Sequence, residues 1–387
     1  MSFPSRKAAV VGVYTSQQAR ALPRTAWSLE VECVKGALED AGLSHRDVDG
    51  LIPMAFDTPL SLHMRWAEQL GGRPISFIDI GSGAGAAAKA ALGVASGMAN
   101  VVVAYFANAG YRLGPQGSAG QPGAPRVGDM SYMIQGAYMS PWYAMWTRRY
   151  MHQYGVRPEQ LAEYAVIARH HATLNPASVM GPRGEITVDD VFSSRMISDP
   201  LHLLECPLDN DGGYAFVIAS EAVARTCRKA PVWILGGAEA AYTDPYQTIT
   251  PDWISDEGAA VRRTADLAFG MAGVSREDID TAGLYDCFPV TVARDLEEMS
   301  FCKVGEGAEY IAAGHLRLGG RMPANTDGGL LSHSHNGNPS GFQVIEVARQ
   351  LRGECGPRQV RGARIGAALS QGWAVHGLAS TVIMAAD

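Results

Sequence analysis

The stretch AGVSREDIDTAGL at residues 272–284 is a near copy of AGLSHRDVDGL at residues 41–51. Each copy follows a helical pattern, carries a serine at a helix N-cap position and leads into an apolar strand. Gly-led apolar helices and late apolar strands recur in the same order, the helices at 81–97 and 338–353 and the strands at 211–224 and 376–387. The sequence therefore predicts an internal duplication of one mixed α/β unit, with chance similarity of short segments as the alternative.

The duplication predicts two similar layered halves packed face to face. Because the Gly-led helices consist mostly of small and apolar residues, we expect them to form a shared central layer between two sheets. The expected halves are residues 1–240 and 241–387, and a loop region at about 110–205 is inserted into the first of them.

The inserted region begins with a turn-rich segment at 114–129 and continues with a stretch dense in Met, Tyr and Trp at 130–155. A helix is expected at 158–173, because Pro158 stands near its start. Aromatic and Met-rich segments provide adaptable apolar surface, which suits a hydrophobic substrate or a subunit interface. Ordinary core packing of these side chains is the alternative.

The composition is that of a folded chain with a large core, since 47% of the 387 residues are hydrophobic and 18% are charged. A net charge of -7 argues against a nucleic-acid-binding surface. The six cysteines include no CxxC pair, so we expect neither a disulfide framework nor a metal site, and we expect a cytoplasmic location. No apolar stretch is long and clean enough to predict a membrane span.

Four segments carry a family resemblance that extends over essentially the whole chain: RHHATLNPAS (169–178), the stretch 194–220, YDCF (285–288) and NTDGGLLSHSHNGNPSG (325–341). They resemble the sterol-carrier-protein-type members of the thiolase superfamily. YDCF resembles the H-D-C-F motif of that group, and the fourth segment resembles its N-x-x-G-G-x-x-S-x-G-H-P-x-G-A-T-G motif. The resemblance implies the five-layered αβαβα thiolase fold and a homodimeric core.

The position of the thiolase nucleophile holds a different residue in this chain. Thiolases of this type place an acyl-accepting cysteine at the start of the first buried helix, and the resemblance assigns that position to Ser82. A serine needs a dedicated base to become nucleophilic, and the neighbouring Gly83 and Ala84 supply none. We therefore expect covalent thiolase chemistry to be lost. A serine nucleophile and a non-enzymatic site are the alternatives.

Three further candidate catalytic residues follow from the resemblance. Tyr285 replaces the histidine of H-D-C-F, which helps to polarise the thioester oxygen in thiolases, and Cys287 is retained. His335 matches the histidine of G-H-P, although the proline after it is Asn336 here. The resemblance to thiolase-like aldolases implies a second tyrosine at the position of His335, so this chain departs from them there.

The remaining residues of the motifs are expected to support the site. We expect Asp286 to orient its neighbours by hydrogen bonding, while Cys287 either transfers protons or packs in the core. Asn325 and Gly377 are further supporting residues, and Gly377 belongs to a late loop in which His376 is expected to be structural.

Without a covalent nucleophile, a β-hydroxyl group allows carbon–carbon cleavage by a retro-aldol reaction, which needs a base, an acid and an oxyanion site. The resemblance to the aldolases of steroid side-chain degradation implies a 3-hydroxyacyl-CoA substrate, with propionyl-CoA or acetyl-CoA and a ketone or aldehyde as products. Tyr285 or His335 would be the base, and an ordinary tyrosine, with a pKa of roughly 10, would need assistance.

The resemblance also implies a small partner protein with a zinc ribbon and an OB fold, in a heterotetramer built on the homodimeric core. Zinc is expected only on that partner, and this chain is expected to hold no cofactor. Two other functions stay open: a covalent thiolase or acyltransferase, and a non-catalytic scaffold that binds acyl-CoA or lipid. A related non-steroid aldolase or thiolase that acts on an aromatic acyl-CoA is a further alternative.

Overall fold

The structure is a computed structural model that describes residues 4–54, 60–109, 139–241, 260–372 and 378–387. Nine strands form one sheet in the order β3-β2-β4-β7-β1-β8-β11-β10-β9. Their bounds are β1 Ala8–Thr15, β2 Gly50–Pro53, β3 Phe77–Ile78, β4 Val101–Asn108, β7 Gly212–Ser220, β8 Val232–Ala241, β9 Thr281–Gly283, β10 Ile365–Gly372 and β11 Leu378–Ala385. A separate pair consists of β5 Met196–Ser198 and β6 Leu201–His202.

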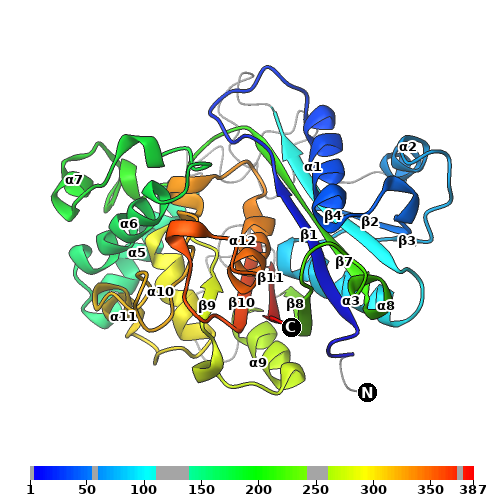
Figure 1. Ribbon diagram of the computed structural model, residues 1–387. Helices are drawn as coiled ribbons and strands as arrows, with labels where there is room; N and C mark the ends of the chain where they lie inside the picture. Colours follow the sequence, from blue (N-terminus) through cyan, green and yellow to red (C-terminus); the bar gives the residue numbers. More distant parts are fainter. Residues whose placement is uncertain (1–3, 55–59, 110–138, 242–259, 373–377) are drawn as a thin grey trace.

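Helices cover both faces of this sheet (Figure 1). The α-helices are α1 Ala26–Ala41, α2 Leu60–Gln69, α3 Gly83–Ala95, α5 Met139–Tyr154, α6 Pro158–Thr173, α7 Val188–Ser193, α8 Glu221–Ala224, α9 Ala260–Ala272, α10 Pro289–Glu298, α11 Gly307–Ala312 and α12 Phe342–Leu351. Within the part of the chain that the structure describes, no helix is long and apolar enough to cross a membrane.

The strand order confirms the internal duplication. Strands β2, β4, β7 and β1 of the first half correspond, in this order, to β9, β10, β11 and β8 of the second. In the first half β3 lies beside β2, and in the second a parallel bridge between Ala282 and Ala324 lies at the corresponding place beside β9. The two half-sheets join where β1 pairs with β8, through Ala9 with Trp233 and Val10 with Val232. In this order β8 of the second half corresponds to β1 of the first. The predicted domain division at residues 240 and 241 stays a prediction.

The helices form three layers around the two half-sheets. Helix α1 packs on β1, β4 and β7, and α9 packs on β8 and β11, so both are outer helices. Helix α3 contacts strands of both halves and also α12, which makes these two Gly-led helices the central layer. Alternate residues of β1 face different cores, Val10 toward α3 and Val11 toward α1, as the two-residue period of a strand requires.

The inserted region between β4 and β7 contains α5, α6, α7 and the β5–β6 pair. Helix α6 packs on α10 and α11. In Figure 1 the insertion lies beside these helices, on the side of the molecule opposite α2 and β3. Tyr143, Trp146 and Tyr150 of α5 are buried, so these members of the Met- and aromatic-rich stretch pack in the core. Residues 110–138 lie outside the described residues.

Candidate active site

The YDCF segment links the end of β9 to the start of α10. Pro289 occupies the first turn of α10, where a missing N–H costs nothing, and Phe288 is the N-cap residue. Because β9 pairs in parallel with β10, the residues that follow both strands lie at one edge of the sheet, which is where ligands bind in many α/β folds.

Tyr285 differs from the rest of this segment in its exposure. Asp286, Cys287 and Phe288 are buried, whereas Tyr285 is half-buried and its side chain packs against the edge of the core. The hydroxyl of Thr291 donates to the Tyr285 carbonyl oxygen over 3.1 Å. The phenol of Tyr285 is therefore partly accessible, while Thr291 of α10 holds the backbone carbonyl of the same residue.

Asn325 holds the residue before Tyr285 at two points. Its Oδ1 accepts from the Leu284 amide over 2.8 Å, and its Nδ2 donates to the Leu284 carbonyl over 3.0 Å. The same Nδ2 donates to the hydroxyl of Tyr164 over 2.7 Å. Asn325 has a φ of 49°, in the left-handed region that asparagine tolerates better than most residues. These contacts hold the backbone next to Tyr285, and the supporting role of Asn325 in catalysis stays a prediction.

Asp286 holds the residue after Tyr285. Its carboxylate accepts from the Tyr164 hydroxyl over 2.7 Å and from the Leu330 amide over 3.0 Å. A side chain at Gly329, which has a φ of 58°, would place its Cβ 2.0 Å from the Asp286 Oδ2, so this approach requires glycine. Burial raises the pKa of Asp286 to about 7, although its hydrogen bonds oppose that shift. These are the contacts of an orienting residue.

Cys287 lies in an environment that keeps its thiol protonated. The side chain is 4% exposed, its Sγ lies 4.0 Å from the Thr291 hydroxyl, and burial raises the pKa of the thiol to about 12. The ring of the adjacent Phe288 stacks on Tyr143 of the insertion with centroids 4.3 Å apart. Packing is the role that these contacts favour, and proton transfer by Cys287 stays a prediction.

His335 lies in the segment that the Asp286 carboxylate joins to YDCF. It follows a short π-helix, η6 Gly329–His333, and its amide donates to Asn210 Oδ1 over 2.8 Å. The side chain keeps some exposure, yet burial lowers the pKa of His335 to about 4. The imidazole is therefore neutral at pH 7. Asn336, at the proline position of the motif, donates from Nδ2 to the Gly212 carbonyl over 3.0 Å.

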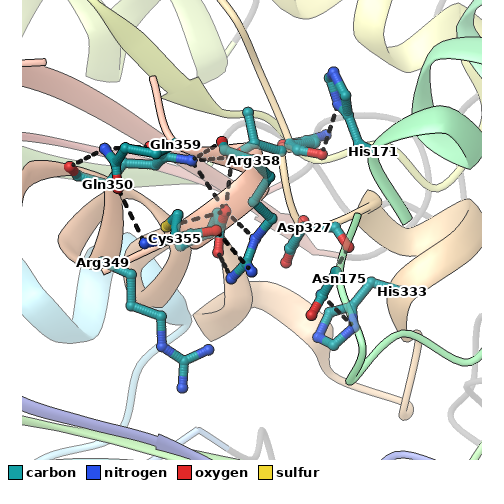
Figure 2. Close-up of polar contacts among 12 residues, drawn as sticks. His171, Asn175, Asp327, His333, Arg349, Gln350, Cys355, Arg358 and Gln359 are labelled. Carbon is teal, nitrogen blue, oxygen red and sulfur yellow. Dashed lines mark hydrogen bonds and ion pairs between the residues drawn. The ribbon is translucent and has the colours of Figure 1, made fainter. Parts of the chain in front are cut away.

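A buried polar network formed by side chains of other segments holds residues 325–333 in place (Figure 2). Glu346 of α12 accepts from the Thr326 hydroxyl over 2.6 Å and pairs with Arg358 through contacts of 3.0 and 3.1 Å. Asn175 donates to the Asp327 carbonyl over 2.9 Å and lies beside His333 in Figure 2. Burying ions requires such full pairing, so this network fixes the loop that carries Asn325.

Ser82 is enclosed at the N-terminus of α3. It is 1% exposed, and its Oγ lies 3.3 Å from the Ser380 Oγ. The first helix amides are also occupied, because Gly83 donates to Ser340 Oγ over 2.9 Å and Ala84 donates to Ser370 Oγ over 3.0 Å. A side chain at Gly83 would place its Cβ 1.7 Å from the Ser340 carbonyl oxygen. Among the described residues, the Ser82 hydroxyl bonds to another hydroxyl and not to a basic side chain.

The predicted residues thus fall into two groups. Contacts of Asp286 join the segments of Tyr285 and His335, whereas Ser82 belongs to a serine cluster under α3. Gly377 and His376 lie outside the described residues. Within the described ranges no group of His, Cys, Asp or Glu is placed to hold a metal ion, and the expectation that this chain binds none stays a prediction.

Sequence reasoning missed three residues that shape the site. Ser340 stands inside the quoted motif, at the threonine of G-A-T-G, and its position could have drawn attention. Ser370 and Tyr164 lie in an ordinary apolar strand and an ordinary helix, and no local pattern distinguishes them. Only the fold brings Tyr164 to Asp286, which is 122 residues away in sequence.

Comparisons with known proteins identify the family. A family model described as "Thiolase C-terminal domain-like" matches residues 245–385. The steroid side-chain-cleaving aldolase of Thermomonospora curvata is 35% identical, over 91% of this chain and 92% of the relative. The 17-hydroxy-3-oxo-4-pregnene-20-carboxyl-CoA lyase of Mycobacterium tuberculosis is also 35% identical, over 90% of this chain and 92% of the relative.

The fold agrees with these relatives. A solved structure described as an Ltp2-ChsH2(DUF35) aldolase superimposes with a TM-score of 0.87 and 31% identity, over 100% of this chain and 99% of that chain. The predicted thiolase fold is thereby confirmed. Because full-length relatives share more than 30% identity with it, the chain belongs to the thiolase superfamily, in the group of sterol-carrier-protein-type thiolase-like proteins that contains the steroid side-chain-cleaving aldolases.

Proposed function

We propose that this protein is a carbon–carbon lyase that performs retro-aldol cleavage of a 3-hydroxyacyl-CoA with a steroid side chain. The products would be propionyl-CoA or acetyl-CoA and a ketone or aldehyde. The relatives described as a steroid side-chain-cleaving aldolase and a carboxyl-CoA lyase support this assignment.

One observation carries the proposal, namely the enclosure of Ser82. A thiolase needs an accessible nucleophile at the start of α3, with helix amides free to stabilise the charge that develops there. Here Ser82 is buried against Ser380, and the amides of Gly83 and Ala84 already donate to serine hydroxyls. A reaction without an acyl-enzyme intermediate fits this arrangement, and a retro-aldol cleavage is such a reaction.

The reaction requires one proton removal and one proton return. A base takes the proton of the β-hydroxyl, the Cα–Cβ bond breaks, and its electron pair passes into the enolate of the thioester. A carbonyl group forms at Cβ, and an acid then protonates Cα. Donors near the thioester oxygen stabilise the enolate, which is often the largest catalytic contribution.

Tyr285 and His335 are the residues to which we assign these steps. Tyr285 is the half-buried phenol of its segment, so it can reach a substrate and exchange the hydroxyl proton. Because burial lowers the pKa of His335 to about 4, its imidazole is neutral at pH 7 and can accept a proton or donate a neutral N–H to the thioester oxygen. Asp286 and Asn325 hold the backbone on either side of Tyr285.

The partner and the acyl-CoA belong to the same proposal. The solved relative is described by two protein names, Ltp2 and ChsH2(DUF35), which supports assembly with a second protein. We assign the zinc-ribbon and OB-fold character, and any zinc, to that partner. A homodimer of this chain would form the core of the assembly, and we place it in the cytoplasm.

A product assay tests the proposed function. The chain is co-expressed with a zinc-ribbon/OB-fold partner and receives a 3-hydroxy, branched steroid side-chain acyl-CoA without free CoA. We expect release of the short acyl-CoA together with the ketone or aldehyde. Tyr285→Phe should abolish release because the proton-exchanging hydroxyl is lost, whereas Ser82→Ala should retain most of it.

Two other outcomes would contradict the proposal. Turnover of a 3-ketoacyl-CoA that requires free CoA and is lost in Ser82→Ala would indicate covalent thiolase chemistry. Binding of both acyl-CoA compounds without turnover of either would indicate a scaffold.

A further inference from the structure

We propose that Tyr164, on helix α6 of the inserted region, is a positioning residue for Tyr285. Its hydroxyl joins the two sets of hydrogen bonds that fix the residues before and after Tyr285. This inference rests on the proposed function, because it assigns Tyr164 a part in the same reaction.

The Tyr164 hydroxyl lies between two groups of the active-site loops. It donates to Asp286 Oδ2 over 2.7 Å and accepts from Asn325 Nδ2 over 2.7 Å. Asn325 binds both backbone groups of Leu284, and Asp286 accepts from the amide of Leu330. The residues on both sides of Tyr285 are therefore connected through one oxygen atom.

The chemistry of these groups suits a tyrosine at this place. A phenol has one O–H to donate and lone pairs to accept, so it can serve a carboxylate and an amide at once. Hydrogen bonds to a carboxylate are stronger than neutral ones, and Tyr164 is fully buried, where a lost partner is costly. Burial and the nearby Asp286 raise the pKa of Tyr164 well above its ordinary value, so it stays a donor.

These hydrogen bonds restrict the motion of the Tyr285 backbone. Its own carbonyl accepts from Thr291, and the backbone groups of Leu284 are held by Asn325. The phenol can then move mainly by rotation of its side chain. Misplacement of a catalytic group by about 1 Å can cost on the order of 100-fold in rate, so the junction at Tyr164 should affect the chemical step.

The inference also gives the insertion a role beyond covering the core. Helix α6 packs on η6 and α10, the two elements that flank the site in sequence. Tyr164 contributes to the site from this packed helix, which is more rigid than a loop.

The test compares two buried tyrosines of the insertion. We expect Tyr164→Phe to lower kcat by about 10- to 100-fold while KM changes less than about threefold, because the substrate does not contact Tyr164. The matched control is Tyr150→Phe, which also removes a buried hydroxyl that donates to a carboxylate, that of Glu297. Glu297 lies on α10 and accepts from the first amide of α11, so this hydroxyl belongs to a different hydrogen-bond network. This control should keep kcat near the wild-type value.

A second readout follows the position of the phenol directly. With 3-fluorotyrosine at position 285, the wild-type chain and Tyr150→Phe should each give one sharp 19F resonance. Tyr164→Phe should broaden or split it, and 4-aminophenylalanine at position 164, which still donates toward Asp286, should restore it. If Tyr164→Phe does not fold, Asp286→Ala removes the acceptor of the Tyr164 hydroxyl and of the Leu330 amide and takes its place.

The outcomes separate this inference from the proposed function. An unchanged kcat and a single sharp resonance in Tyr164→Phe would overturn the positioning role, as would equal losses in Tyr150→Phe. If the wild-type chain shows no retro-aldol turnover, the proposed function fails, and the 19F comparison still decides whether Tyr164 positions residue 285.

Discussion

Four consecutive residues, Tyr285 to Phe288, show how differently neighbours in sequence can be used. Tyr285 is half-buried and faces the site, Asp286 accepts hydrogen bonds from two other segments, and Cys287 and Phe288 fill the core. The sequence alone cannot separate a titrating cysteine from a packed one, because burial decides the pKa of the thiol.

Asp286 should make stability depend on pH in a direction opposite to that of most aspartates. Burial raises the pKa of Asp286 to about 7, whereas an unfolded aspartate titrates near about 3.9. The stability that comes from the protonated carboxyl is then complete below about pH 4 and is lost as the pH rises through about 7. We expect the stability of wild type relative to Asp286→Asn to fall over this interval, by about 4 kcal/mol at most.

Urea unfolding of both proteins at intervals between pH 4 and pH 8 measures this difference. If the difference in free energy of unfolding between the two proteins stays constant with pH, Asp286 has the same protonation in the folded and the unfolded state. A gap that widens in favour of wild type as the pH rises would mean that the hydrogen bonds from Tyr164 and Leu330 outweigh burial.

At the scale of an element, helix α3 is anchored by side chains from the other half of the chain. Its first amides donate to Ser340 and Ser370, and the Ser370 hydroxyl in turn donates to the Ser340 carbonyl over 2.7 Å. A helix leaves four amides without partners at its N-terminus, and burial makes each one costly. Ser340 and Ser370 satisfy two of these amides.

Ser370→Ala should therefore destabilise the protein more than Ser82→Ala does. The first change leaves the buried amide of Ala84 without its acceptor, which costs about 1–3 kcal/mol. The second removes only a contact of 3.3 Å between two hydroxyls, worth less than about 1 kcal/mol. Denaturant midpoints of the two variants give the comparison, and equal losses would mean that another group caps α3.

At the scale of the whole molecule, apolar side chains gather at the β3 edge of the sheet. Ile78 and Ile80 are 46% and 41% exposed, and Leu92 and Met98 are 49% and 55% exposed. Ser76 donates to the Met98 carbonyl over 2.8 Å, which places the ends of α3 and β3 together. An open edge strand with exposed apolar residues is a suitable surface for self-association.

In the homodimer that we propose, Ile80→Asp should shift the equilibrium toward the monomer, because it places a charge in this apolar edge. Light scattering after size-exclusion chromatography reports the mass of each species. Val304→Asp, at a 37% exposed residue just before α11, should leave the mass unchanged. Helix α11 lies on the opposite side of the molecule from β3 (Figure 1). A dimer that survives Ile80→Asp would locate the interface elsewhere.

The fold could be predicted because its evidence repeats in sequence. The copies at 41–51 and 272–284 contain local signals, a helix end, a capped turn and a strand, and each half reproduces the same strand order. Tyr285 and His335 were predicted because they stand in recognisable motifs. Tyr164 and Ser370 act only through contacts that the tertiary structure creates, so no local pattern of either segment could reveal them.

The cysteines have a practical consequence for measurements in crude extracts. All six are free, and burial raises the pKa of every one of them: Cys33, Cys206, Cys227, Cys287, Cys302 and Cys355. Thiolates, rather than thiols, react with alkylating reagents. These reagents should therefore react slowly with this protein and rapidly with enzymes whose cysteine lies at an accessible helix N-terminus. Iodoacetamide would then inactivate the cysteine-dependent enzymes of a lysate, so that the lyase reaction of this chain can be measured without their interference.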